Sequence, residues 1–81
     1  MVIREDEICA RVVSIINSAG EPLETKEVEQ RVREKLKSAG ITRTKIFYRL
    51  NLLRGDGAIN GKFIGPGKGV WIWWKKEIVK K

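Results

Sequence analysis

The fold is decided by residues 42–59, TRTKIFYRLNLLRGDGAI. Apolar side chains recur in this stretch at i, i+4 and i+7, the spacing of one buried helix face, at Ile46, Leu50 and Leu53. Thr42 is suited to be the N-cap of this helix, and the glycines near residue 55 are suited to end it. The pattern predicts a helix over about residues 42–54, followed by an extended segment.

The same periodicity predicts two helices upstream. The first covers about residues 5–18, with an apolar stripe formed by Ile8, Val12, Ile15 and Ile16 and widened by Cys9 and Val13. The second covers about residues 25–38, with Thr25 as its N-cap and with apolar positions at Val28, Val32 and Leu36. Its outer face places glutamates four residues before arginines, in the pairs Glu27–Arg31 and Glu29–Arg33. We expect these pairs to be solvated and without a function.

Downstream, residues 59–74 are predicted to form a two-stranded β-hairpin with the glycine-rich tip GPGKG at 65–69. The extended link at Leu23 is a candidate for a short extra strand. The second hairpin strand, VWIWW, is apolar on both faces, because alternation places Trp71 and Trp73 on one face and the other three residues on the opposite face. Packing on the helices accounts for one face. The other face needs a second cover. The candidates are the spare stripe of the first helix, a partner subunit and a stacked base.

The charge is distributed unevenly along the chain. The 81 residues include 17 Lys and Arg and 10 Asp and Glu, for a net charge of +7. Residues 1–40 carry 7 basic and 8 acidic side chains, whereas residues 41–81 carry 10 basic and 2 acidic ones and end in a basic tail over 75–81. All six aromatic residues also lie in the second half. A basic, aromatic half favours a polyanionic partner.

The composition also argues against several classes of protein. The length favours one small domain over residues 1–81. Without histidine and with Cys9 as its one cysteine, the sequence offers no Cys/His zinc site, no histidine-containing catalytic triad and no internal disulfide. We therefore expect no enzyme, no metal and no cofactor. No apolar signal segment or long apolar run is present, so a cytoplasmic protein is expected.

The order of helix, short link, helix, helix and hairpin resembles the winged helix-turn-helix family over residues 23–74. Residues 44–59 are similar to the family's recognition helix and its exit, where aliphatic residues spaced four and three apart precede an acidic residue, Gly, a small residue and Ile. Residues 60–74 correspond to the wing. The resemblance implies an α+β fold with three helices and a two-stranded wing. It also implies double-stranded DNA binding, usually by a small transcription regulator, with the third helix in the major groove and the wing on the backbone or minor groove.

The candidate contacts are polar or basic residues on the third helix and the hairpin. Arg43 can pair bidentately with guanine or hold a phosphate, Asn51 can reach adenine, and Tyr48 can touch a thymine methyl group or a phosphate. Arg49 and Arg54 lie nearer the core and are better suited to the DNA backbone. The full set of predicted DNA-binding residues is Thr42, Arg43, Thr44, Lys45, Tyr48, Arg49, Asn51, Lys62 and Lys68.

Two other functions stay open at this stage. The tryptophan-rich hairpin is also compatible with a winged-helix module that binds another protein, and its basic aromatic character with single-stranded nucleic-acid binding. A homodimer reading two half-sites is a further possibility. No pattern indicates a membrane or a small-molecule ligand as a partner.

Overall fold

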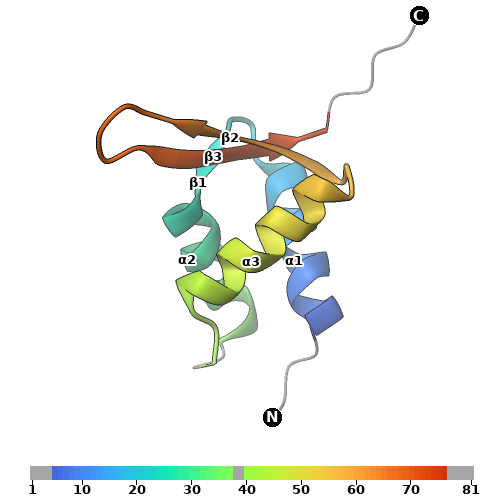
Figure 1. The fold of residues 1–81 in the computed structure, drawn as a ribbon. Helices are drawn as coiled ribbons and strands as arrows, with labels where there is room; N and C mark the ends of the chain where they lie inside the picture. The colour runs from blue at the N-terminus through green and yellow to red at the C-terminus, as the bar shows by residue number, and fades with distance from the viewer. Residues whose placement is uncertain (1–4, 38–39, 77–81) are drawn as a thin grey trace, which may run out of the picture.

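The computed structural model describes residues 5–37 and 40–76, which form three helices and a three-stranded antiparallel sheet (Figure 1). The elements are α1 (Glu5–Ser18), β1 (Leu23–Glu24), α2 (Thr25–Leu36), α3 (Arg43–Gly55), β2 (Ile59–Ile64) and β3 (Val70–Lys75). The α+β class and the element order agree with the prediction. The sheet has three strands because the segment at Leu23 pairs with β3. No helix within the described residues is long and apolar enough to cross a membrane.

The two ends of α2 differ from the prediction. Its N-cap is Glu24 rather than Thr25, and the Glu24 backbone N–H donates to Glu27 Oε1 at 2.9 Å. Its last residue is Leu36, because Lys37 adopts the left-handed conformation at φ 49° and ψ 42° and donates its N–H to the Arg33 carbonyl at 2.7 Å. The predicted end at residue 38 lies outside the described residues, as do residues 77–81 of the basic tail.

The caps of α3 agree with the sequence pattern. The Thr42 hydroxyl accepts from the Lys45 backbone N–H at 3.2 Å, which makes Thr42 the N-cap. At the other end, the N–H of Gly57 donates to the Arg54 carbonyl at 3.1 Å and that of Ala58 to the Leu53 carbonyl at 2.9 Å. This pairing is the Schellman arrangement, whose left-handed position is filled by Gly57 at φ 80°. The helix therefore turns directly into β2.

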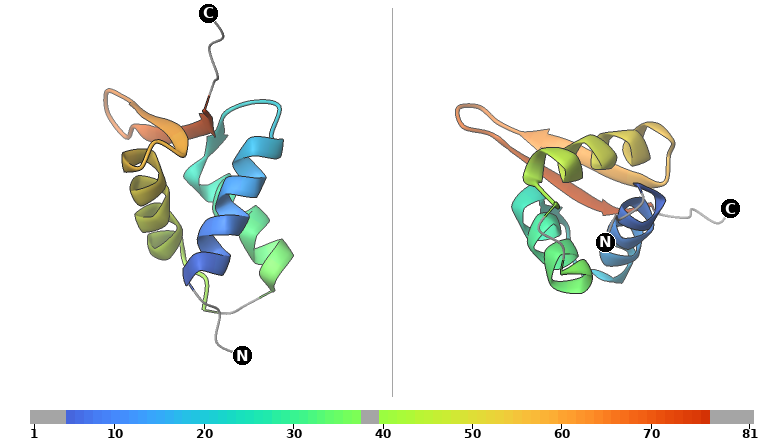
Figure 2. Two further views of the ribbon diagram at one scale, coloured as in Figure 1. Left: turned by 90° about the vertical axis from the view of Figure 1, so that its right-hand side faces the viewer. Right: turned by 90° about the horizontal axis from the view of Figure 1, so that it is seen from below.

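The sheet lies across the three helices and contributes to one core with them (Figure 2). Its strand order is β1-β3-β2, so β3 is the central strand. Trp73 of this strand is fully buried, opposite Leu23 on one side and Gly61 on the other. The helices contribute the apolar stripes predicted from their periodicity, including Val12, Ile16, Val28, Val32, Ile46 and Leu50.

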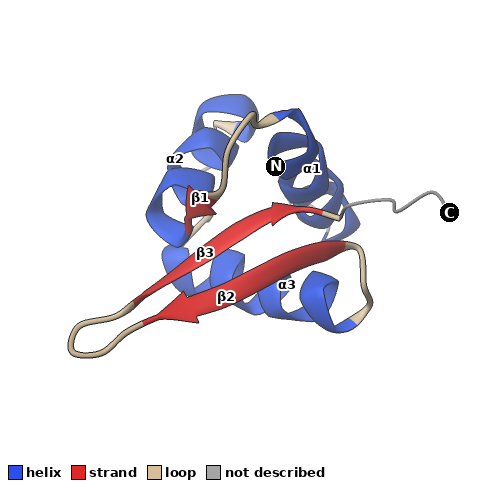
Figure 3. Cartoon of the chain, turned by 90° about the horizontal axis from the view of Figure 1, so that it is seen from above, coloured by secondary structure: helices blue, strands red, loops and turns tan. Residues whose placement is uncertain are grey.

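The two faces of β3 have different surroundings. Trp71 and Trp73 face the helices, and their rings stack with centroids 5.1 Å apart. The alternate residues Val70, Ile72 and Trp74 are half-buried. Among the described elements no helix lies over this outer face, which Figure 3 shows toward the viewer. The stripe of α1 that includes Cys9 and Val13 therefore does not cover the outer face of β3. A partner subunit and a stacked base remain as the predicted alternatives.

Candidate nucleic-acid interface

The face of α3 that points away from the core is exposed and carries no carboxylate. Ile46 and Leu50 are fully buried, whereas Tyr48 is 59% exposed and Leu52 is 46% exposed. Together with the exposed Thr44 and Lys45, they form a stripe with helical spacing. Three of these four residues were predicted to contact DNA. Leu52 adds an apolar contact area between the polar positions.

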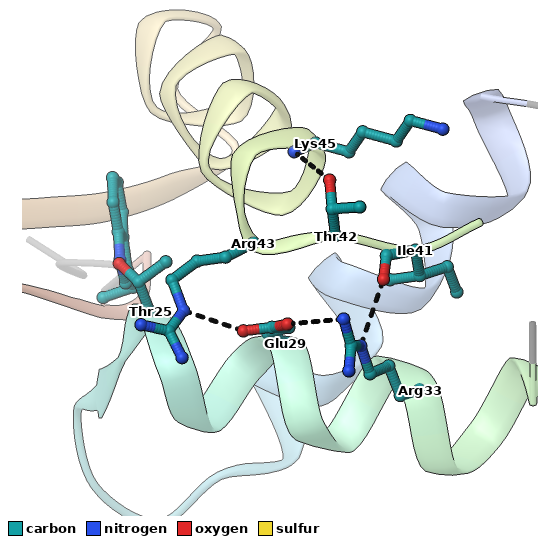
Figure 4. Close-up of polar contacts among 8 residues, drawn as sticks. Thr25, Glu29, Arg33, Ile41, Thr42, Arg43 and Lys45 are labelled. Carbon is teal, nitrogen blue, oxygen red and sulfur yellow. Dashed lines mark hydrogen bonds and ion pairs between the residues drawn. The ribbon is translucent and has the colours of Figure 1, made fainter. Parts of the chain in front are cut away.

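Arg43, the first residue of α3, is tethered to α2. Its Nε donates to Glu29 Oε1 at 2.8 Å, while 65% of its side chain stays exposed. The other Glu29 oxygen, Oε2, pairs with Arg33 Nη2 at 3.0 Å, and Arg33 Nε donates to the Ile41 carbonyl at 3.1 Å (Figure 4). The predicted Glu29–Arg33 pair therefore exists, but its carboxylate is buried between two helices rather than solvated.

Two predicted DNA contacts on α3 are less exposed than the prediction requires, although Arg49 was expected to lie near the core. Arg49 is only 6% exposed, and its Nη1 donates to the Lys45 carbonyl at 3.0 Å. This burial removes Arg49 from the surface that a duplex could reach. Asn51 is half-buried, and its Nδ2 donates to the Phe47 carbonyl at 2.9 Å. Its amide is therefore partly used within the helix.

The two lysines predicted on the hairpin are both exposed. Lys62 lies on the outer face of the sheet opposite Ile72, and Lys68 lies at the tip. Two glycines of the tip are required by the local structure. Gly67 has φ 82°, and a Cβ atom on Gly69 would overlap the ring of Phe63. We therefore attribute these glycines to the shape of the tip, which presents Lys68 to solvent.

The hairpin tip and α3 lie on the same side of the molecule, opposite α1 (Figure 2). Between them is an open groove of about 460 Å³, bounded by the first turns of α2 and α3 and by the start of β3. The groove is lined by Glu24, Thr25, Lys26, Arg43, Thr44, Phe47, Gly69, Val70 and Trp71. The structure thus brings the predicted residues Arg43 and Thr44 next to the base of the hairpin.

Exposed charge in the second half of the chain has one dominant sign. Between residues 41 and 76, Asp56 is the one carboxylate, and it lies at the C-terminal end of α3. The exposed cations in the same range are Arg43, Lys45, Arg54, Lys62, Lys68, Lys75 and Lys76. Of these, Arg54 is partly engaged within the chain, since its Nε donates to the Gly61 carbonyl at 3.1 Å and its guanidinium lies 5.4 Å from the centroid of a Trp71 ring.

Two residues of this region were missed by the sequence patterns. Lys26 lines the groove from the first turn of α2, and the spacing that identified this helix contained no signal for it. Glu29 joins α2 to α3 although it was expected to be solvated. On a helical wheel Glu29 lies about 60° from Val32, so its position at the edge of the apolar stripe was an available signal.

No family model, curated protein or solved structure matches the chain. The function is therefore inferred from the chemistry and arrangement of its residues.

Proposed function

We propose that this protein binds double-stranded DNA as a winged helix-turn-helix module and acts as a small transcription regulator. In this proposal α3 enters the major groove, and the β2–β3 hairpin contacts the backbone or the adjoining minor groove. Binding itself, rather than a chemical reaction, produces the effect.

One observation carries the proposal: the exposed face of α3 and the hairpin tip lie on the same side of the molecule, and each presents cations and no carboxylate of its own, although Glu24 lies in the groove between them. A face that only kept the protein in solution would mix both signs. Cations on both elements allow the protein to neutralise phosphates at two places along one duplex, which supplies the electrostatic part of DNA affinity.

The shape and chemistry of α3 also suit a major groove. A groove about 12 Å wide admits one helix, and the N-terminal end of a helix has a positive dipole that favours phosphate oxygens. Thr44 and Lys45 lie at this end. Tyr48 and Leu52 follow one and two turns later and offer apolar contacts suitable for thymine methyl groups.

The direct test is a salt titration with a labelled random-sequence duplex, followed by fluorescence anisotropy. If about five phosphates are neutralised, log K should fall against log salt with a slope of about −4 to −5. A single strand of the same length should compete less well than the duplex. Absence of duplex binding at low salt would refute the proposal, and stronger competition by the single strand would indicate single-strand binding instead.

A second candidate function is protein binding through the outer face of the sheet. It is favoured by the half-buried Val70, Ile72 and Trp74, over which no described helix lies, and by a shallow groove of about 400 Å³ between this face and residues 19–22. Association through such an apolar face should persist at high salt, where exposed charges are screened. Sedimentation at low and high salt would detect self-association of this kind.

A further inference from the structure

The contact between Glu29 and Arg43 restricts how Arg43 can bind a ligand. An arginine guanidinium has five N–H donors in a rigid plane and can use either its Nε side or the edge formed by Nη1 and Nη2. In Arg43 the Nε is engaged by Glu29 at 2.8 Å. The Nη1–Nη2 edge is therefore the one available for a bidentate contact.

Glu29 is well suited to hold Arg43 in one orientation. It is only 8% exposed, and its second oxygen is bound by Arg33 at 3.0 Å. Arg33 is itself fixed by its bond to the carbonyl of Ile41, a fully buried residue that precedes α3. The carboxylate thus has two partners, which leave it little freedom to move with Arg43 (Figure 4).

The ligand chemistry that matches an exposed Nη1–Nη2 edge is a pair of acceptors in one plane. In the major groove guanine presents such a pair, O6 and N7, and contacts from arginine to these two atoms are the commonest specific ones. A phosphate also offers two oxygens, but a flexible lysine can bind it equally well as a point charge, so phosphate binding does not need a fixed guanidinium. A guanidinium whose orientation is fixed loses less side-chain entropy on base contact, because part of its freedom is already lost in the free protein.

We propose that Glu29 is a positioning residue that directs Arg43 to read a guanine in the major groove. The proposal rests on the proposed function, since it requires a bound duplex. In this proposal the pair Glu29–Arg43 determines the preference for one base, whereas the lysines provide the affinity for any duplex.

The test is selection of bound duplexes from a random pool by the wild-type protein and by two variants of α2. Glu29→Gln removes the carboxylate that holds Arg43. Glu34→Gln, the matched control, removes the same charge from an exposed position of α2 that contacts Gln30 rather than Arg43. Both variants should bind random duplex slightly more tightly than the wild type, because each gains one unit of positive charge. Only Glu29→Gln should lose most of a guanine preference on the order of tenfold.

Arg43→Lys covers the case in which Glu29→Gln does not fold. Lysine keeps a cation beside Glu29 but lacks the planar fork, so this variant should lose the same guanine preference and keep the salt slope. A merely structural role of Glu29 would weaken preference at every position of the selected site instead of at one guanine. The Arg43 Nε–H resonance in free protein gives a readout without DNA: its exchange with water should be slow in the wild type and in Glu34→Gln, and fast in Glu29→Gln.

The outcomes separate this proposal from the proposed function. Absence of duplex binding by the wild type refutes both. Wild-type binding with a guanine preference that Glu29→Gln or Arg43→Lys retains overturns the role of the pair and leaves DNA binding intact. The same conclusion follows if no guanine is enriched, or if the Arg43 Nε–H exchanges equally fast in the wild type and in Glu29→Gln.

Discussion

The indole Nε1 of Trp73 donates a hydrogen bond to Thr25 Oγ1 at 2.9 Å, which joins β3 to the first turn of α2. Trp73 is fully buried at the centre of the sheet, so its N–H has no access to water. A buried indole N–H requires a partner, and Thr25 supplies it from a position 48 residues earlier in the chain. The hydroxyl that the sequence suggests as a helix cap is thus used to anchor the hairpin.

Replacement of Thr25 by valine should destabilise the protein. Valine matches the shape of threonine but leaves the Trp73 N–H without its acceptor, at a cost of about 1–3 kcal/mol. Thermal unfolding should show a decrease in Tm of about 4–8 °C for each kcal/mol lost. Thr25→Ser keeps the hydroxyl and should stay close to the wild type. A wild-type Tm for Thr25→Val would contradict the role of the hydrogen bond, and a loss in Thr25→Ser alone would show that the methyl group matters instead.

Substitution of Gly61 by alanine should disturb the packing of the sheet. An added Cβ would overlap the ring of Trp73 and lie 3.2 Å from Arg54 Cδ. Since Trp73 is enclosed by the core, it cannot move away, and overpacking of this kind costs about 1–3 kcal/mol. Gly20→Ala is the control, because nothing lies within 4 Å of its added Cβ. Chemical denaturation of both variants would measure the difference, and a wild-type stability of Gly61→Ala would contradict the packing described.

Replacement of Lys37 by glycine (Lys37→Gly) should stabilise the protein. Lys37 occupies the left-handed region at φ 49°, which costs a residue with a Cβ about 1–2 kcal/mol and glycine very little. Part of this gain is offset by the greater freedom of glycine in the unfolded chain, so a net gain of about 0.5–1 kcal/mol is expected. Arg31→Gly removes the same charge inside α2 and should instead lose about 1 kcal/mol. A decrease in Tm for Lys37→Gly would contradict the left-handed cap.

Replacement of Lys68 by alanine should weaken binding to all duplexes alike. Loss of one phosphate contact should make the slope of log K against log salt less negative by about 0.9. Lys35→Ala provides the matched control, because Lys35 lies in the groove between α1 and α2, away from the hairpin. Anisotropy titrations at several salt concentrations would compare the two variants. Equal effects of both would show that net charge, rather than the position of Lys68, determines affinity.

The helix and strand positions could be predicted because each depends on local signals. The apolar stripe at Ile46, Leu50 and Leu53, the Thr42 cap and the glycine exit at residue 57 all act within a few residues of one another. The end of α2 could not be predicted in the same way. Its left-handed residue is a lysine, and lysine has no conformational preference that would mark it as a helix end.

The residue types of the candidate site could be predicted from the sequence, whereas the contacts of its individual side chains could be predicted less well. Charge counting along the chain identified the basic half, and periodicity identified the outward face of α3, because both are properties of the order of residues. The state of individual arginines was only partly predictable: the helical pattern placed Arg49 nearer the core, but it gave no sign of its full burial or of the tether on Arg43. Arg43 is exposed and bound to Glu29, whereas Arg49, six residues later on the same helix, is buried.

The amino-acid sequence alone thus determines the order of the elements, the inward stripe of each helix and the concentration of cations after residue 40, since these follow from local periodicity and composition. The packed structure determines which face of β3 meets the helices, which partner satisfies Trp73 and which carboxylate holds Arg43. Each of these contacts joins residues more than ten positions apart. Such pairs are selected by how two helices and a sheet fit together, and neither partner carries a local signal of the other.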